Sequence, residues 1–150
     1  MDTRQDLLSF VAERTLAMVG MSRAPHSFSA SAARELRARG YRVLPVNPHA
    51  TAIDGEKCYP SLAALPEKVG GALLVTPPAA TEQAVRDAVA AGIDHLWIQQ
   101  GAESSGALAF CRERNLRAVS RQCILMFAEP VRGFHRLHRW CNKLLGRWPR

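Results

Sequence analysis

The chain has 150 residues, of which 47% are hydrophobic and 22% are charged. These values are ordinary for a globular domain and argue against the disordered, collagen-like and low-complexity classes. The length suits one domain of ordinary size, or one domain with a short appendage. It is too small for a multidomain ligase with separate nucleotide-grasp and acyl-transfer domains.

The positive charge is concentrated at the end of the chain. Lys and Arg number 20 against 13 Asp and Glu, which gives a net charge of +7, and no acid follows Glu129. The last segment carries Arg132, Arg136, Arg139, Lys143, Arg147 and Arg150. We therefore predict a domain over residues 1–130 and a basic amphipathic helical extension over residues 131–150. The extension predicts an anionic partner or a protein partner, and a solvated helix without a partner is the alternative.

The cysteines, the first residues and the lengths of the apolar runs indicate the environment of the protein. Cys58, Cys111, Cys123 and Cys141 form no C-x-x-C pair, which argues against a zinc knuckle or a dithiol motif. The first residues are polar rather than apolar, unlike a signal peptide, and no run approaches the ~20 apolar residues of a membrane span. We expect a soluble, cytoplasmic protein.

Strand-like and helix-like patterns alternate along the chain. Short apolar runs predict strands at 15–20, 41–46, 72–76, 95–99 and 116–119. Helical spacing predicts helices at 3–13, 29–39, 81–91, 103–114 and 131–144, with a short helical turn at 61–66 and a turn at Asp54-Gly55. Buried strands joined by helices form parallel sheets. The predicted fold class is α/β: a Rossmann-like, three-layer parallel sheet of about five strands with helices on both faces, plus a basic C-terminal helix.

Ligands of such sheets bind beyond the carboxyl ends of the strands, so the residues that follow each strand are the candidates. Gly20, Met21, Ser22 and Arg23 follow the first strand. A glycine lets the backbone approach a phosphate, and the next helix offers free N–H groups. The pattern G-x-G-x-x-G is absent, so a plain strand-to-helix turn is the alternative.

Val46, Asn47 and Pro48 follow the second strand. NAD-binding folds usually place an acid here to hold the ribose hydroxyls, and Asn47 carries no charge. The sequence therefore argues against NAD and suits a phosphorylated ribose, with Arg42 and His49 as nearby candidates for that phosphate.

Thr76, Pro77 and Pro78 follow the third strand, and Gln99, Gln100 and Gly101 follow the fourth. The prolines predict a rigid apolar wall for a base or a pantetheine arm, or alternatively a stop before the next helix. The glutamine amides can donate and accept hydrogen bonds at the same edge, and Gly101 permits a close approach.

Four segments together resemble a known family: Ala17–Arg23 with Pro25, Gly40–Pro48, Gly55–Leu62 and Leu96–Gly101. In this order they resemble the small stand-alone CoA-binding proteins with a Rossmann-like fold. They are also distantly similar to the CoA-binding domain of the succinyl-CoA synthetase alpha subunit. The segment His26–Ser29 lacks the basic and proline character of that part of the family.

The resemblance implies a non-catalytic protein that binds coenzyme A or an acyl-CoA as a carrier, sensor or regulatory partner. It places the diphosphate at Gly20–Arg23 and the adenosine near Val46–Pro48 and Thr76–Pro78. The extension after Pro130 lies outside the resemblance.

No catalytic constellation is visible in the sequence. A nucleophile elbow, an H-E-x-x-H motif and paired carboxylates are absent, and His26 and His49 are more often surface residues than acid–base catalysts. Cys123 is expected to be a buried structural cysteine, although an exposed thiol there could pair with the CoA thiol. Two alternatives stay open: an NAD(H)-sensing module whose basic tail contacts nucleic acid, and an acyl-CoA enzyme or enzyme subunit.

Overall fold

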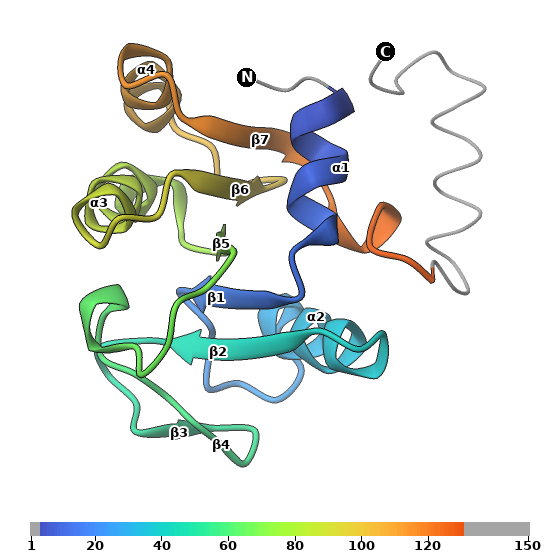
Figure 1. The fold of residues 1–150 in the computed structure, drawn as a ribbon. Helices are drawn as coiled ribbons and strands as arrows, with labels where there is room; N and C mark the ends of the chain where they lie inside the picture. Colours follow the sequence, from blue (N-terminus) through green and yellow to red (C-terminus); the bar gives the residue numbers. More distant parts are fainter. Residues whose placement is uncertain (1–3, 131–150) are drawn as a thin grey trace.

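The computed structural model describes residues 4–130 as a parallel five-stranded sheet covered by helices on both faces (Figure 1). The sheet has the strand order β2-β1-β5-β6-β7. Its strands are β1 (Thr15–Val19), β2 (Arg42–Val46), β5 (Gly71–Leu74), β6 (His95–Gln99) and β7 (Arg117–Gln122). All neighbouring pairs are parallel. The Rossmann-like α/β fold predicted from the alternating pattern is confirmed.

Four helices cover the sheet. They are α1 (Arg4–Ala12), α2 (Phe28–Ala38), α3 (Pro78–Ala90) and α4 (Ser105–Glu113). Figure 1 shows α1 and α2 on one face and α3 and α4 on the other. Side chains alternate along each strand, so Leu16 and Met18 of β1 join the core under α1 and α2, whereas Ala17 joins the core under α3 and α4.

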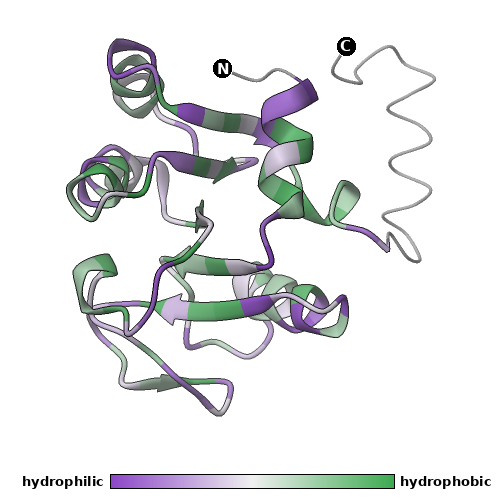
Figure 2. Ribbon diagram, viewed as in Figure 1, coloured by the Kyte–Doolittle hydropathy of each residue, from purple (hydrophilic) through white to green (hydrophobic). Residues whose placement is uncertain are grey.

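Two central strands of the sheet are buried along their whole length. All five residues of β6 and all four residues of β5 are buried. Figure 2 shows the hydrophobic colour in the sheet and hydrophilic segments on the outer helices. This distribution is the one expected of a parallel sheet covered on both faces.

Smaller elements complete the described part. Strands β3 (Ala52–Ile53) and β4 (Glu56–Lys57) form a hairpin outside β2. Its turn contains Asp54 and Gly55, both with positive φ, as a two-residue hairpin requires. The short 3-10 helices are η1 (Leu62–Ala64) and η2 (Ile124–Met126).

Arg39 holds η2 against α2. Its buried guanidinium donates from Nη1 to the carbonyls of Leu125 (2.9 Å) and Ala128 (2.7 Å), and it pairs with Glu35. Charged donors that satisfy buried carbonyls make strong hydrogen bonds, so this side chain fixes the end of the described chain.

The predicted boundaries differ from the observed ones by one or two residues at several ends, and two were wrong by more than that. Helix α3 begins at Pro78 instead of Thr81, because a proline fits the first helical position and Thr81 is buried inside the helix. Strand β7 continues to Gln122, beyond the predicted end at Val119, because it pairs with β6 across a β-bulge.

The predicted helix at 131–144 lies outside the described residues, and the division into domains at residue 130 stays a prediction. Within residues 4–130, every helix is too short or too polar to cross a lipid bilayer.

Candidate functional site

The connections of the sheet reverse direction between β1 and β5. Helix α2 leads from β1 outward to β2, and α3 leads from β5 outward to β6 on the opposite face. Such a reversal leaves a crevice at the carboxyl ends of the two central strands, where doubly wound sheets bind ligands.

A cleft of about 460 Å³ occupies this position. It is lined by the segments that follow β1, β5 and β6: Gly20, Ser22, Ser27, Phe28, Ser29, Val75, Thr76, Pro77, Pro78, Gln99, Gln100, Gly101 and Ala102. Both α2 and α3 begin at the cleft, so two helix N-termini, each with a partial positive charge, face the same space. The cleft therefore has the electrostatics of an anion site.

Gly20 is required by the packing of the cleft. Its φ is +84°, and its N–H donates to the Val46 carbonyl at 3.0 Å. A Cβ at this position would lie 2.7 Å from Thr76 Cγ2 and 3.0 Å from Thr76 Cα. The close contact between the loops after β1 and β5 thus gives Gly20 a structural reason beside the predicted approach to a phosphate.

Serine hydroxyls fix the loop after β1 onto the first turn of α2. The Ser22 N–H donates to Ser29 Oγ at 2.9 Å, and Ser22 Oγ accepts from the Ala24 N–H at 3.1 Å. Ser27 caps α2 by accepting from the Ala30 N–H at 3.2 Å. The N–H groups of Phe28 and Ser29 belong to the first helical turn, where no intrahelical acceptor exists.

A threonine pair ties the loops after β5 and β6 together. Thr81 Oγ1 lies 2.7 Å from Thr76 Oγ1 and donates to the Ala102 carbonyl at 2.6 Å. Since Thr81 is fully buried, these bonds hold the two loops at a fixed separation. Thr81 therefore lies inside α3 and joins the two loops, although the predicted helix of residues 81–91 began at this residue.

The loop after β6 is held by a carboxylate. Glu103 accepts from the N–H groups of Gly101 and Arg121, each at 2.8 Å. Arg121 has a positive φ and stands at the bulge of β7. Gln99 is buried, and its Oε1 accepts from the Ile124 N–H at 3.2 Å, which leaves the exposed Gln100 as the adaptable amide of this loop.

The structure brings together seven of the twelve predicted site residues. Those lining the cleft are Gly20, Ser22, Thr76, Pro77, Pro78, Gln99 and Gly101. The other five, Met21, Arg23, Val46, Asn47 and Pro48, do not line it. Met21 and Val46 are buried in the core, whereas Arg23 and Pro48 are exposed.

Asn47 links two loops. Its Nδ2 donates to the Met21 carbonyl at 2.9 Å, and its Oδ1 accepts from the His49 N–H at 2.8 Å. Burial raises the pKa of the neighbouring Cys58 thiol, which donates to the Asn47 carbonyl across 3.7 Å. The side chain of Asn47 therefore holds the loop after β2 against the loop after β1 at the carboxyl edge of the sheet.

Sequence reasoning missed Ser27, Phe28 and Ser29. A serine three residues before a helical N–H is a capping signal, and this signal marks the start of α2 at Phe28. Helix N-termini of a doubly wound sheet face the ligand edge, so the first turn of α2 was an available candidate.

The lining side chains include no charged group, histidine or cysteine. Among residues 4–130, no group of three or more His, Cys, Asp and Glu side chains could hold a metal ion. Hydrogen bonds and helix dipoles are thus the polar resources of the cleft.

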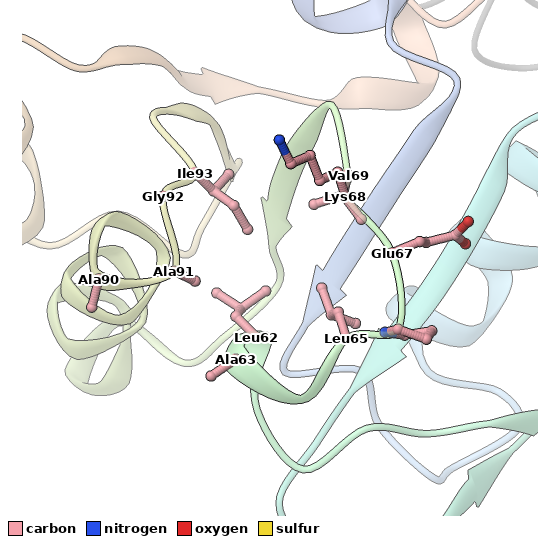
Figure 3. A pocket seen from close by; sticks show the side chains of 11 residues that line it. Leu62, Ala63, Leu65, Glu67, Lys68, Val69, Ala90, Ala91, Gly92 and Ile93 are labelled. Carbon is pink, nitrogen blue, oxygen red and sulfur yellow. The ribbon is translucent and has the colours of Figure 1, made fainter.

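A larger cavity, of about 720 Å³, lies at the amino edge between the segment before β5 and the end of α3 (Figure 3). The aliphatic side chains of Leu62, Leu65 and Ile93 point toward it. It lies at the end of α3 that carries partial negative charge, so it lacks the electrostatics of the cleft.

Known structures resemble this chain over most of its length. A conserved hypothetical protein from Pyrococcus furiosus is 37% identical with a TM-score of 0.70, covering 74% of this chain and 96% of its own. A hypothetical protein from Pyrococcus horikoshii OT3 is 28% identical with a TM-score of 0.78, covering 89% and 93%.

A larger protein shares the fold. The dinucleotide forming acetyl-coenzyme A synthetase 1 of Ca. Korarchaeum cryptofilum is 24% identical with a TM-score of 0.60, over 71% of this chain and 25% of its own. Residues 14–129 match the family model described as CoA binding domain, and this match contains β1 to β7 and every residue of the cleft. The chain belongs to the CoA binding domain family.

Proposed function

We propose that this protein binds coenzyme A or an acyl-CoA in the cleft at the carboxyl edge and catalyses no reaction itself. It acts as a carrier, a sensor or a regulatory partner. The observation that carries the proposal is the cleft between two helix N-termini, at the reversal of the sheet, in a chain whose family is described by CoA binding.

The diphosphate lies at the first turn of α2. There the N–H groups of Phe28 and Ser29 can donate to phosphate oxygens, together with one hydroxyl of the Ser27–Ser29 pair, whose oxygens lie 3.2 Å apart. Helix α3 begins with Pro78, which lacks an N–H, so it contributes its dipole and an apolar wall instead.

The chemistry of the lining supports a binding role. Acyl transfer needs a nucleophile with an adjacent base or acid, and the cleft offers only hydroxyls and amides beside apolar groups. Cys123, the candidate thiol of the enzyme alternative, is buried. Asn47 counts against NAD(H) sensing, because it stands where NAD-binding folds carry an acid and its amide already bonds to backbone groups.

Titration calorimetry with CoA tests the proposal. We expect saturable binding by the wild-type protein. Gln100→Glu places a negative charge on the cleft wall and is expected to weaken binding about fivefold to tenfold, corresponding to roughly 1 kcal/mol. Gln5→Glu makes the same charge change on the exposed surface of α1 and is expected to leave the Kd unchanged.

An absence of heat with millimolar CoA contradicts the proposal. If Gln5→Glu and Gln100→Glu weaken CoA binding equally, the ligand does not bind in the cleft, and this result also contradicts the proposal.

A further inference from the structure

Phe28 is an apolar side chain that the fold leaves uncovered at the cleft. In the described part of the chain, two large hydrophobic side chains stay exposed: Leu8 at 53% and Phe28 at 46%. Leu8 is on α1 and does not line the cleft, whereas Phe28 does. An aromatic ring on a cleft wall gains hydrophobic free energy when a ligand covers it.

The rest of the cleft wall matches one part of CoA. Pro77 and Pro78 add an apolar surface at the start of α3, and the exposed Gln100 adds an amide. The pantetheine arm is uncharged, carries a branched dimethyl group beside its phosphate, and has two amides further along. The adenosine end carries an additional phosphate, for which the lining offers no cationic side chain.

We propose that the pantetheine arm, and not the adenosine, occupies this cleft, with Phe28 as the side chain that selects it. This inference rests on the proposed function. The phosphate of the arm lies at the first turn of α2, its dimethyl group packs against Phe28 and the two prolines, and its amides bond to Gln100. The adenosine lies outside the cleft lining.

Fragments of CoA test this placement. The ligands are CoA, 4′-phosphopantetheine and adenosine 3′,5′-bisphosphate, and the variants are Phe28→Ala, Phe28→Leu and the matched control Leu8→Ala. We expect Phe28→Ala to weaken CoA and 4′-phosphopantetheine about tenfold, the factor for uncovering part of an aromatic side chain. Phe28→Leu keeps an apolar contact and is expected to lose less, and Leu8→Ala is expected to lose nothing.

The outcome for the adenosine fragment decides the placement. Unchanged or absent binding of adenosine 3′,5′-bisphosphate by the wild type and Phe28→Ala supports the inference. A loss of its affinity in Phe28→Ala equal to that of CoA places the adenine on Phe28 and overturns it. Failure of 4′-phosphopantetheine to bind the wild type also overturns the inference. So does binding of CoA and 4′-phosphopantetheine by Phe28→Ala with the same affinities as by the wild type.

A second measurement identifies the contact directly. In isotope-filtered NMR spectra of the complex, we expect cross-peaks between the Phe28 ring protons and the dimethyl protons of CoA, and cross-peaks to adenine protons contradict the placement. If the wild type does not bind CoA, the proposed function is refuted. If the wild type binds CoA and Phe28→Ala binds it equally well, this inference alone is refuted.

Discussion

The carboxyl and amino edges of the sheet are closed in different ways. At the amino edge, α1 packs Phe10 against Gly71, where a Cβ would lie 2.6 Å from the ring. The same ring contacts His95 edge-on at a centroid distance of 5.1 Å and Trp97 at 5.4 Å. At the carboxyl edge, hydroxyl hydrogen bonds fix the loops, and the space between them stays open.

Helix α3 shows why the smaller of the two spaces is the better anion site. Its N-terminus faces the cleft of about 460 Å³, and its C-terminal residues Ala90 and Ala91 line the cavity of about 720 Å³. The helix dipole places partial positive charge at the cleft and partial negative charge at the larger cavity. Position and polarity therefore identify the site, and volume does not. Amino-edge substitutions should change stability without changing ligand affinity.

Phe10→Ala is expected to have the largest effect. Phe10 is fully buried, and removing its ring leaves a cavity under α1, so the free energy of unfolding should fall by about 3–5 kcal/mol. The Kd for CoA, measured at a temperature where the variant is folded, should be unchanged. Denaturant unfolding and titration calorimetry measure the two quantities.

Leu8→Ala is the matched control on the same helix. Its side chain is exposed, so the free energy of unfolding should fall by no more than about 0.5 kcal/mol. A change of CoA affinity in Phe10→Ala would show that the two edges are coupled.

Gly20→Ala tests the carboxyl edge. The new Cβ meets Thr76 and the residue keeps a positive φ, so we expect a loss of about 2–4 kcal/mol together with weaker CoA binding. Gly40→Ala is the control, because Gly40 has a φ of +88° and no atom within 4 Å of its Cβ position. It should cost about 1–2 kcal/mol and leave the Kd unchanged. If the free energy of unfolding falls equally in Gly20→Ala and Gly40→Ala, the contact with Thr76 is not the cause of the loss.

The alternation of strands and helices could be predicted because buried parallel strands appear as short apolar runs between helical patterns. Strand β6 was predicted with its observed bounds. The start of α3 was missed because Pro77 and Pro78 were interpreted as a wall or a stop before the helix, whereas a proline also fits the first helical position. The end of β7 was missed because Ser120, Arg121 and Gln122 are polar, and only their pairing with β6 makes them a strand.

The site could be predicted as far as topology determines it. The rule that ligands bind beyond the carboxyl ends of strands identified Gly20, Thr76 and Gly101, and all three line the cleft. Phe28 was missed because its exposure depends on where α2 begins and how it packs. Whether Val46, Asn47 and Pro48 contact the adenosine stays a prediction.

His95 is the titratable group buried at the amino edge. Its Nε2 lies 3.2 Å from Ser9 Oγ, and Ser9 donates its single hydroxyl hydrogen to the Asp6 carbonyl at 2.9 Å. Nε2 is therefore the donor, and Nδ1 carries a lone pair. Among residues 4–130, Nδ1 has no hydrogen-bond partner, so a proton there would be buried without an acceptor.

The smallest predicted effect is a dependence of stability on pH through His95. Burial, and then the charge of Arg117, lower its pKa in the folded protein, against smaller opposing effects of Asp6, Glu13 and Asp94. The unfolded chain, with a pKa near 6.5, therefore binds more protons as the pH falls below that value. Stability should be constant with respect to this group above pH ~6.5 and should decrease from there toward the lowered folded pKa.

Denaturant unfolding between pH 7.5 and pH 5 measures this slope, over about the range in which histidine titrates. His95→Gln keeps a donor for Ser9 without a titratable group, and His95→Leu removes both, so the two variants should share a flatter pH profile whatever their absolute stabilities. CoA affinity at pH 7.5 should not change in His95→Gln, since His95 lies at the edge opposite the cleft. A wild-type slope that persists in both variants would assign the pH dependence to groups other than His95.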